Sequence, residues 1–166
     1  MRRPSCSWMK AITSNAPPKG LAAALVLLAA CSPGAPPGVD KARLDEAVSR
    51  AIGDPNSCVL IARKGEGRAL YRYNTATACA REWPACDKPG LTKLADLLEA
   101  AAKDGQPRLL SCDSAADGSR GVGWAAGPVA GKDLVYAAVM EGDRVLPGLI
   151  IASKLEGAFK RAGVSE

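Results

Sequence analysis

The chain of 166 residues contains no histidine. Catalysis by a Ser-His-Asp or Cys-His arrangement and metal sites built on imidazole are therefore excluded, because each needs histidine as a base or a ligand. Aromatic residues are also scarce, with one Phe, three Trp and three Tyr, so leucine, valine, isoleucine and alanine must fill most of any core. These absences favour a protein that is not an enzyme and that holds no metal and no cofactor.

Acidic residues are missing from the first 31 positions, whereas Arg2, Arg3, Lys10 and Lys19 lie there. These four belong to a total of 22 Lys and Arg, so the chain after Cys31 carries 18 basic residues against 17 acidic ones. A net charge of about +1 gives no electrostatic reason to expect binding to nucleic acid. The sequence pI of about 9.0 mainly reflects the basic leader.

That leader has the form of a secretory signal peptide, in which a basic segment is followed by a short apolar run. The apolar run covers residues 21–30, which is shorter than the roughly 20 residues needed to span a membrane as a helix. Both Met1 and Met9 fit as the first residue, because a start at Met9 shortens an unusually long basic segment. We assign residues 1–30 to the signal peptide.

The sequence Leu28-Ala29-Ala30-Cys31 resembles the lipobox of bacterial lipoproteins, where a signal peptidase cuts just before an acylated cysteine. The resemblance implies that Cys31 becomes the lipidated first residue of the mature protein, with palmitate among its acyl chains. In such lipoproteins a non-acidic residue after the cysteine, here Ser32, goes with export to the outer membrane. The resemblance therefore implies a membrane anchor there, with the protein facing the periplasm.

Residues 31–38 combine the lipidated cysteine with a segment rich in proline and glycine, which predicts a mobile tether. The remaining residues, 39–166, suit one domain with one core. Apolar periodicity and turn residues predict the order α-β-β-α-β-β-β-α. The expected elements are a helix at 40–53, strands at 58–62 and 68–73, a helix from Pro89 to Gly105, strands at 108–112, 121–127 and 133–140, and a helix at 151–163.

This order predicts an α+β fold, with an antiparallel sheet of about five strands and helices packed on it. The segment 133–140 is nearly all apolar and should be a central strand, whereas residues 74–88 are expected to be irregular. The same order also fits profilin-like and roadblock-type domains.

Signal cleavage removes Cys6 and acylation uses Cys31, which leaves Cys58, Cys79, Cys86 and Cys112. An even number of cysteines in an exported domain predicts two disulfides, for which three pairings are possible. We favour Cys79 with Cys86, and Cys58 with Cys112. A four-cysteine zinc site and a redox pair are the competing interpretations, but neither close C-x₂₋₄-C pairs nor a C-x-x-C motif occurs.

Three further segments, 70–74 (LYRYN), 84–88 (PACDK) and 123–127 (GWAAG), resemble stretches of class D β-lactamases and penicillin-binding transpeptidases. The chain departs from that pattern at the chemical positions. No Ser-x-x-Lys occurs after Cys31, and the K-T-G triad is absent. A serine without its lysine stays protonated at neutral pH, so the resemblance implies a degenerate relative that does not form an acyl-enzyme.

Together these features predict a lipid-anchored protein of the bacterial cell envelope with a small, disulfide-stabilised, non-catalytic binding domain. Its expected partners are the membrane, through Cys31, and a protein or peptidoglycan-related molecule. Two alternatives remain: a degenerate penicillin-binding protein that still binds muropeptide or β-lactam, and a lipoprotein of the immunity or exclusion type.

Overall fold

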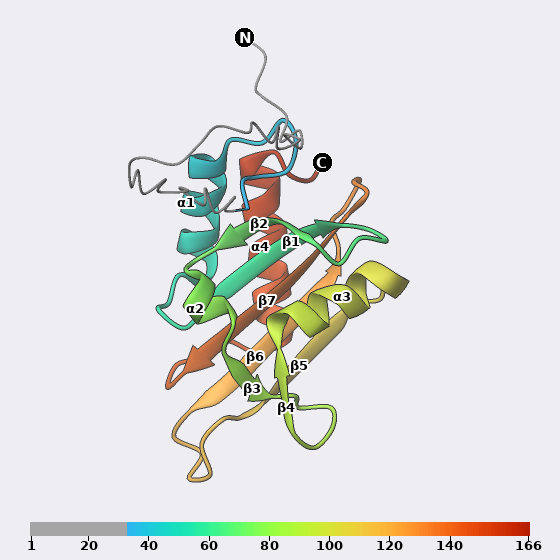
Figure 1. The fold of residues 1–166 in the computed structure, drawn as a ribbon. Coiled ribbons are helices and arrows are strands. Elements are labelled where there is room, and N and C mark those ends of the chain that lie inside the picture. Colours follow the sequence, from blue (N-terminus) through green and yellow to red (C-terminus); the bar gives the residue numbers. More distant parts are fainter. Residues whose placement is uncertain (1–32) are drawn as a thin grey trace, which may run out of the picture. The chain divides into compact units, whose positions relative to one another are not determined.

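A five-stranded antiparallel sheet forms the centre of the computed structural model, which describes residues 33–166 (Figure 1). The sheet order is β2-β1-β7-β6-β5, and β3 and β4 form a separate two-stranded sheet. The elements are α1 (Lys41–Ile52), β1 (Cys58–Arg63), β2 (Ala69–Tyr73), α2 (Ala76–Cys79), β3 (Glu82–Pro84), β4 (Leu91–Lys93), α3 (Leu94–Asp104), β5 (Arg108–Asp113), β6 (Gly121–Pro128), β7 (Leu134–Gly142) and α4 (Gly148–Ala162). The predicted α+β class is confirmed, and the predicted order is recovered with α2, β3 and β4 inserted.

Strand β7 lies at the middle of the sheet, as its apolar sequence predicts. Helices cover both faces: α1 and α4 lie together on one face, and α3 lies on the other (Figure 1). Side chains therefore alternate between two apolar clusters. The first is centred on α1 and α4 and contains Leu44, Ile151 and Phe159. The second lies under α3 and contains Leu98 and Trp124.

The first helix begins where its capping residue predicts. The Asp40 carboxylate accepts a hydrogen bond from the Arg43 backbone N–H at 2.8 Å, which satisfies one of the free donors of the first turn. Just before it, Pro36 is buried and its carbonyl accepts a hydrogen bond from the Val39 N–H at 3.1 Å. The chain thus closes a turn against the domain before α1. The leader and Cys31 lie outside the described residues.

The prediction for residues 74–93 is wrong in two respects. The segment contains the short helix α2 and the β3–β4 hairpin rather than irregular chain, and α3 begins at Leu94 rather than at Pro89. The physical reason is that Pro89 and Gly90 end the loop 85–90 that joins β3 to β4, where Gly90 adopts a φ of 102°. The helix is instead capped by Asp96, whose carboxylate accepts the Lys93 N–H at 3.1 Å.

The four cysteines of the domain do form two disulfides, but the favoured pairing is wrong. The bonds join Cys58 to Cys79 and Cys86 to Cys112, with Cα–Cα distances of 5.3 and 5.4 Å. Strands β7 and β6 separate β1 from β5. At about 4.8 Å per strand spacing, Cys58 and Cys112 lie too far apart for a disulfide. Helix α2 and the β3–β4 turn supply the true partners.

Within residues 33–166, none of the helices combines the length and the apolar character required to cross a bilayer.

Candidate functional site: a groove between α4 and β5

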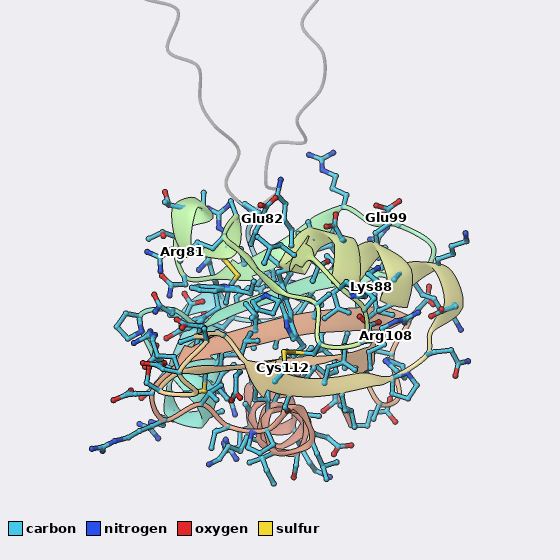
Figure 2. All side chains as sticks on the ribbon, turned by 90° about the horizontal axis from the view of Figure 1, so that it is seen from below. Arg81, Glu82, Lys88, Glu99, Arg108 and Cys112 are labelled. Carbon is cyan, nitrogen blue, oxygen red and sulfur yellow. A yellow bond between two sulfur atoms is a disulfide. The ribbon has the colours of Figure 1, made fainter. Side chains whose placement is uncertain are left out.

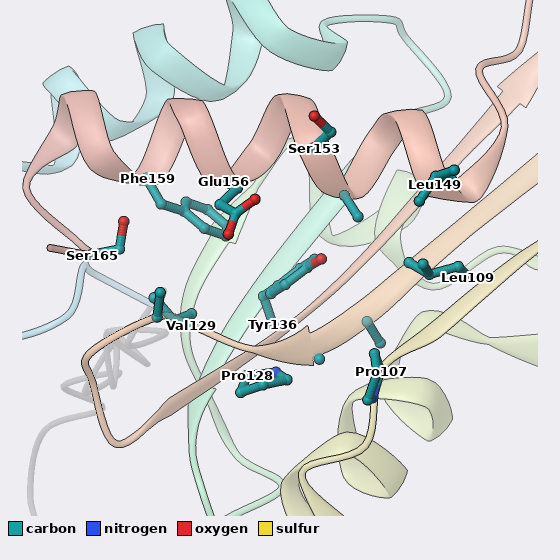
Figure 3. A pocket seen from close by; sticks show the side chains of 14 residues that line it. Pro107, Leu109, Pro128, Val129, Tyr136, Leu149, Ser153, Glu156, Phe159 and Ser165 are labelled. Carbon is teal, nitrogen blue, oxygen red and sulfur yellow. The ribbon is translucent and has the colours of Figure 1, made fainter.

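An open apolar groove of about 370 Å³ lies between α4 and the adjoining ends of β5 and β6 (Figure 3). Its volume falls within the roughly 300–1,000 Å³ typical of ligand sites. A second cavity, between α3 and β5, measures about 100 Å³. Two further cavities, beside Val39 and beside Ser49, measure about 300 and 350 Å³. The groove is the better candidate for a binding site because its lining is the most apolar of the four.

One wall of the groove comes from a single face of α4. Leu149, Ala152, Ser153, Glu156 and Phe159 recur at intervals of three and four residues, which places them on one side of the helix. Phe159 is buried and contacts the Tyr136 ring edge-on, with the ring centroids 5.3 Å apart. Leu149, at the opposite end, is 63% exposed. The groove thus has a closed aromatic end and an open aliphatic end.

The other wall is formed by strands that carry small side chains toward α4. Gly123, Ala125 and Gly127 alternate along β6 on this side. At Gly123 a Cβ atom would lie 2.2 Å from the Leu146 carbonyl oxygen, so glycine lets the chain leading into α4 lie directly on the sheet. Gly127 lines the groove instead, where the helix and the strands are further apart. The groove therefore lies beside Gly127, further along β6 than the close contact between Gly123 and Leu146.

The groove contains few polar groups. Burial raises the pKa of the Tyr136 hydroxyl to about 12, and the nearby Glu156 carboxylate adds to that rise. The hydroxyl is therefore protonated at neutral pH and available as a hydrogen-bond donor. Among the described residues that line the groove, Glu156 is the only charged one. This favours an apolar ligand that carries a single positive charge.

Two of the three segments that resemble penicillin-binding enzymes meet on the opposite face of the sheet, whereas residues 70–74 lie apart from them, at the end of β2. The Trp124 indole N–H donates to the Pro84 carbonyl at 2.9 Å, which joins the second and third of these segments. Cys86 lies where the resemblance places the nucleophile, and its sulfur is bonded to Cys112 of the edge strand β5, which is labelled in Figure 2. Lys88 and Arg108 line the small cavity beside it. The site therefore has no free thiolate.

A buried carboxylate lies near the far end of β7. The Glu141 side chain is 3% exposed and accepts two hydrogen bonds of 2.8 Å from the Arg120 guanidinium. Asn56 and Ser114 donate two more, at 2.9 and 3.0 Å. Arg120, as the strongest partner, holds the pKa of Glu141 below its ordinary value. The cluster ties two loops to β7, which indicates a structural role.

Sequence reasoning placed its site residues elsewhere. Cys58, Cys79, Cys86 and Cys112 are structural disulfide partners, and Cys31 lies outside the described residues. The groove was missed, because the alternating small residues of β6 indicate a close contact but do not show which element lies against them. Within residues 33–166, no group of three or more acidic, cysteine or histidine side chains is arranged to hold a metal ion.

Comparison of the chain with protein-family models, with curated proteins and with solved structures gave no match.

Proposed function

We propose that this chain is a lipid-anchored protein of the bacterial cell envelope whose domain binds a partner, without catalysis, in the groove between α4 and β5. The observation that carries the binding role is the groove itself, with its apolar walls, single carboxylate and ligand-sized volume. Both disulfides support an exported, oxidising location, because such bonds rarely persist in the cytosol.

The proposal that the domain binds without catalysis is supported by the chemistry of its side chains. The chain has no histidine to act as a base, and the four domain cysteines are all consumed by disulfides. The tyrosine in the groove stays protonated well above neutral pH, so it serves as a donor and not as a base. These groups support a role in binding.

The anchoring role rests on the lipobox resemblance at Cys31 and on the short segment that joins it to the domain. A single acyl chain holds a protein on a membrane only marginally, whereas the two or three chains of a lipoprotein hold it firmly. The domain would then work within reach of the membrane surface, facing the periplasm from the outer membrane.

Anchoring is tested by labelling the full chain with radioactive palmitate in a Gram-negative host. We expect the label on the unaltered protein and its loss from the Cys31→Ala variant, which should also keep its leader. The matched control is Cys6→Ala, which changes a cysteine of the leader and should leave labelling intact. Normal processing of Cys31→Ala without any label on the unaltered protein would contradict the proposal.

The groove is tested with Nile red, an uncharged dye that fluoresces in apolar sites and is not repelled by the Glu156 carboxylate. Ala152 lies in the α4 wall, so Ala152→Trp should fill the space and weaken dye binding about tenfold, equal to roughly 1.4 kcal/mol. Lys154→Trp is the matched control, because it adds the same ring to an exposed position of α4 that does not line the groove. Equal dye binding by both variants would show that the groove is not the site.

A second candidate is a degenerate penicillin-binding protein that holds muropeptide or β-lactam in the small cavity near Lys88. The Trp124 to Pro84 hydrogen bond favours it, because two of the resembling segments meet there. With Cys86 in a disulfide, we expect mass spectrometry to find no covalent adduct after incubation with labelled penicillin. Reversible penicillin binding, measured by calorimetry and lost in Lys88→Ala but kept in Ala152→Trp, would favour this candidate over the groove.

A further inference from the structure

Strand β5 is an edge of the main sheet and pairs with β6 alone. In an antiparallel pair, the backbone groups of successive residues point alternately toward the partner strand and away from it. The Ser114 N–H donates to the Arg120 carbonyl at 2.8 Å, just beyond the last pair of the β5–β6 ladder. By alternation, residues 108, 110 and 112 are bonded to β6, and the N–H and C=O groups of 109, 111 and 113 point away.

These outward groups have no other backbone partner in the part of the chain that the structure describes. An edge of this kind is a template for another strand, and proteins usually protect it with proline, lysine or a covering segment. The outward positions of β5 are Leu109, Ser111 and Asp113. Pro107 and Asp113 limit the stretch at its two ends, whereas Leu109 and Ser111 between them carry neither a proline ring nor a charge. The edge therefore offers a row of unused donors and acceptors.

The same edge borders the groove. The backbone N–H and C=O of Leu109 point away from β6. The side chain of Leu109 is 41% exposed and lines the groove near Leu149 (Figure 3). Ser111 lies on the same face of β5 and accepts a hydrogen bond from the Gly148 N–H at 2.9 Å, which fixes the start of α4 beside the strand. A strand added along β5 would therefore place alternate side chains next to the groove opening.

We propose that the occupant of the groove is an extended segment of a partner protein, which adds to β5 as a sixth strand. Its apolar side chains, at every second position, enter the groove, and a lysine or arginine beside them pairs with Glu156. The inference rests on the proposed binding role of the groove and specifies its ligand. An acyl chain would fill the apolar walls equally well, but it would leave the outward backbone groups of β5 and the Glu156 carboxylate without partners.

The test uses the full mature protein and an eight-residue synthetic peptide of alternating valine and threonine with a lysine at each end. Two derivatives carry backbone N-methyl groups, one at every valine and the other at every threonine. Only one of these sets can face β5, so calorimetry should show binding reduced at least tenfold by one derivative and little changed by the other. Equal binding of both derivatives would overturn strand addition and favour a purely apolar ligand.

Variants of the protein test the two contacts separately. Leu109→Pro removes an outward N–H without breaking the β5–β6 ladder, since edge strands accept proline at such positions, and it should weaken peptide binding about tenfold. Leu109→Val also shortens this groove-lining side chain but keeps the N–H donor, so it should weaken peptide binding much less than Leu109→Pro does. Glu156→Lys should weaken binding of the lysine peptide and restore binding of a peptide with glutamate at each end.

Other outcomes separate this inference from the proposed function. If Ala152→Trp abolishes dye binding but no peptide binds, the groove is a binding site and strand addition is wrong. If neither dye nor peptide binds, both proposals fail. If sedimentation shows a dimer of the unaltered protein that Leu109→Pro disperses, the occupant is a second copy of this chain, and the proposal of a separate partner is overturned.

Discussion

Replacing Cys58 and Cys79 together by alanine should lower the free energy of unfolding by about 3 kcal/mol. The bond closes a segment with a sequence separation of 21 residues, and loops of that length lose about 3 kcal/mol of stabilisation when a disulfide is removed. Burial adds to the loss, because Cys58 is fully buried and Cys79 is 9% exposed. The measurement is urea denaturation of the mature protein, followed by circular dichroism without reductant.

The disulfide between Cys86 and Cys112 provides the comparison. Its sequence separation is 26 residues, so the chain-entropy contribution is similar, but both cysteines are only half-buried and leave less of a void. We therefore expect Cys86→Ala with Cys112→Ala to cost somewhat less than the first pair. If burial around Cys58 did not matter, the longer loop closed by Cys86 and Cys112 would make the loss of that bond slightly the more costly of the two.

A third pair of substitutions tests the connectivity. Cys58→Ala with Cys112→Ala removes one member of each bond, so the present pairing predicts the loss of both disulfides and about twice the loss of stability. If Cys58 were bonded to Cys112, the same variant would lose only one. Dye binding in the groove should survive the loss of either bond in the folded protein, because Cys58 lies in the apolar cluster under α3, across the sheet from α4.

The sequence predicts the main sheet well because its signals are local. The apolar segment around residues 133–140 is long enough to require cover on both faces. Asp40 and Gly53 mark the two ends of α1, because each forms a hydrogen bond with the backbone of the helix. Turn chemistry is more ambiguous. Pro89 suits the first turn of a helix and also a hairpin turn, and only the pairing of β3 with β4 decides between them.

Pairings between distant residues could not be read from the sequence. The partners of Cys58 and Cys112 depend on which strands lie between them, and a spacing pattern contains no such information. The groove was missed for the same reason, since it depends on how α4 diverges from β6 beyond Gly123. The outward edge at Leu109 likewise becomes visible only when β5 is known to lie at the end of the sheet.

Replacing Arg120 by alanine should cost about 2 kcal/mol at pH 7, because the Glu141 carboxylate then stays buried with only Asn56 and Ser114 as partners. Hydrogen bonds to charged groups contribute roughly 1.5–3 kcal/mol. Breaking a fully buried ion pair costs more, but the Arg120 side chain is 44% exposed, so water can reach the space it leaves. The control is Arg161→Ala, an exposed arginine of α4, which should change stability by less than about 0.5 kcal/mol.

The pH dependence separates charge from packing. The folded pKa of Glu141 lies below its ordinary value of 4.5, chiefly because of its hydrogen bonds from Arg120. Its contribution to stability is therefore complete above the unfolded pKa and is lost as the pH falls through the lower folded value. The unfolding free energies of the unaltered protein and of Arg120→Ala should differ most at pH 7 and converge toward pH 3. An equal difference at both values would show that Arg120 acts through packing alone.

The same cluster bears on the proposed binding edge. Ser114 and Arg120 lie at the two ends of the loop between β5 and β6, and both are bonded to Glu141 of β7. Asp113, the last outward residue of β5, directly precedes this loop. Arg120→Ala should therefore let the end of β5 fray, and it should weaken binding of the valine–threonine peptide more than binding of the dye. If Arg120→Ala weakened peptide binding and dye binding equally, the cause would be a lower stability of the whole domain and not a change in the edge strand.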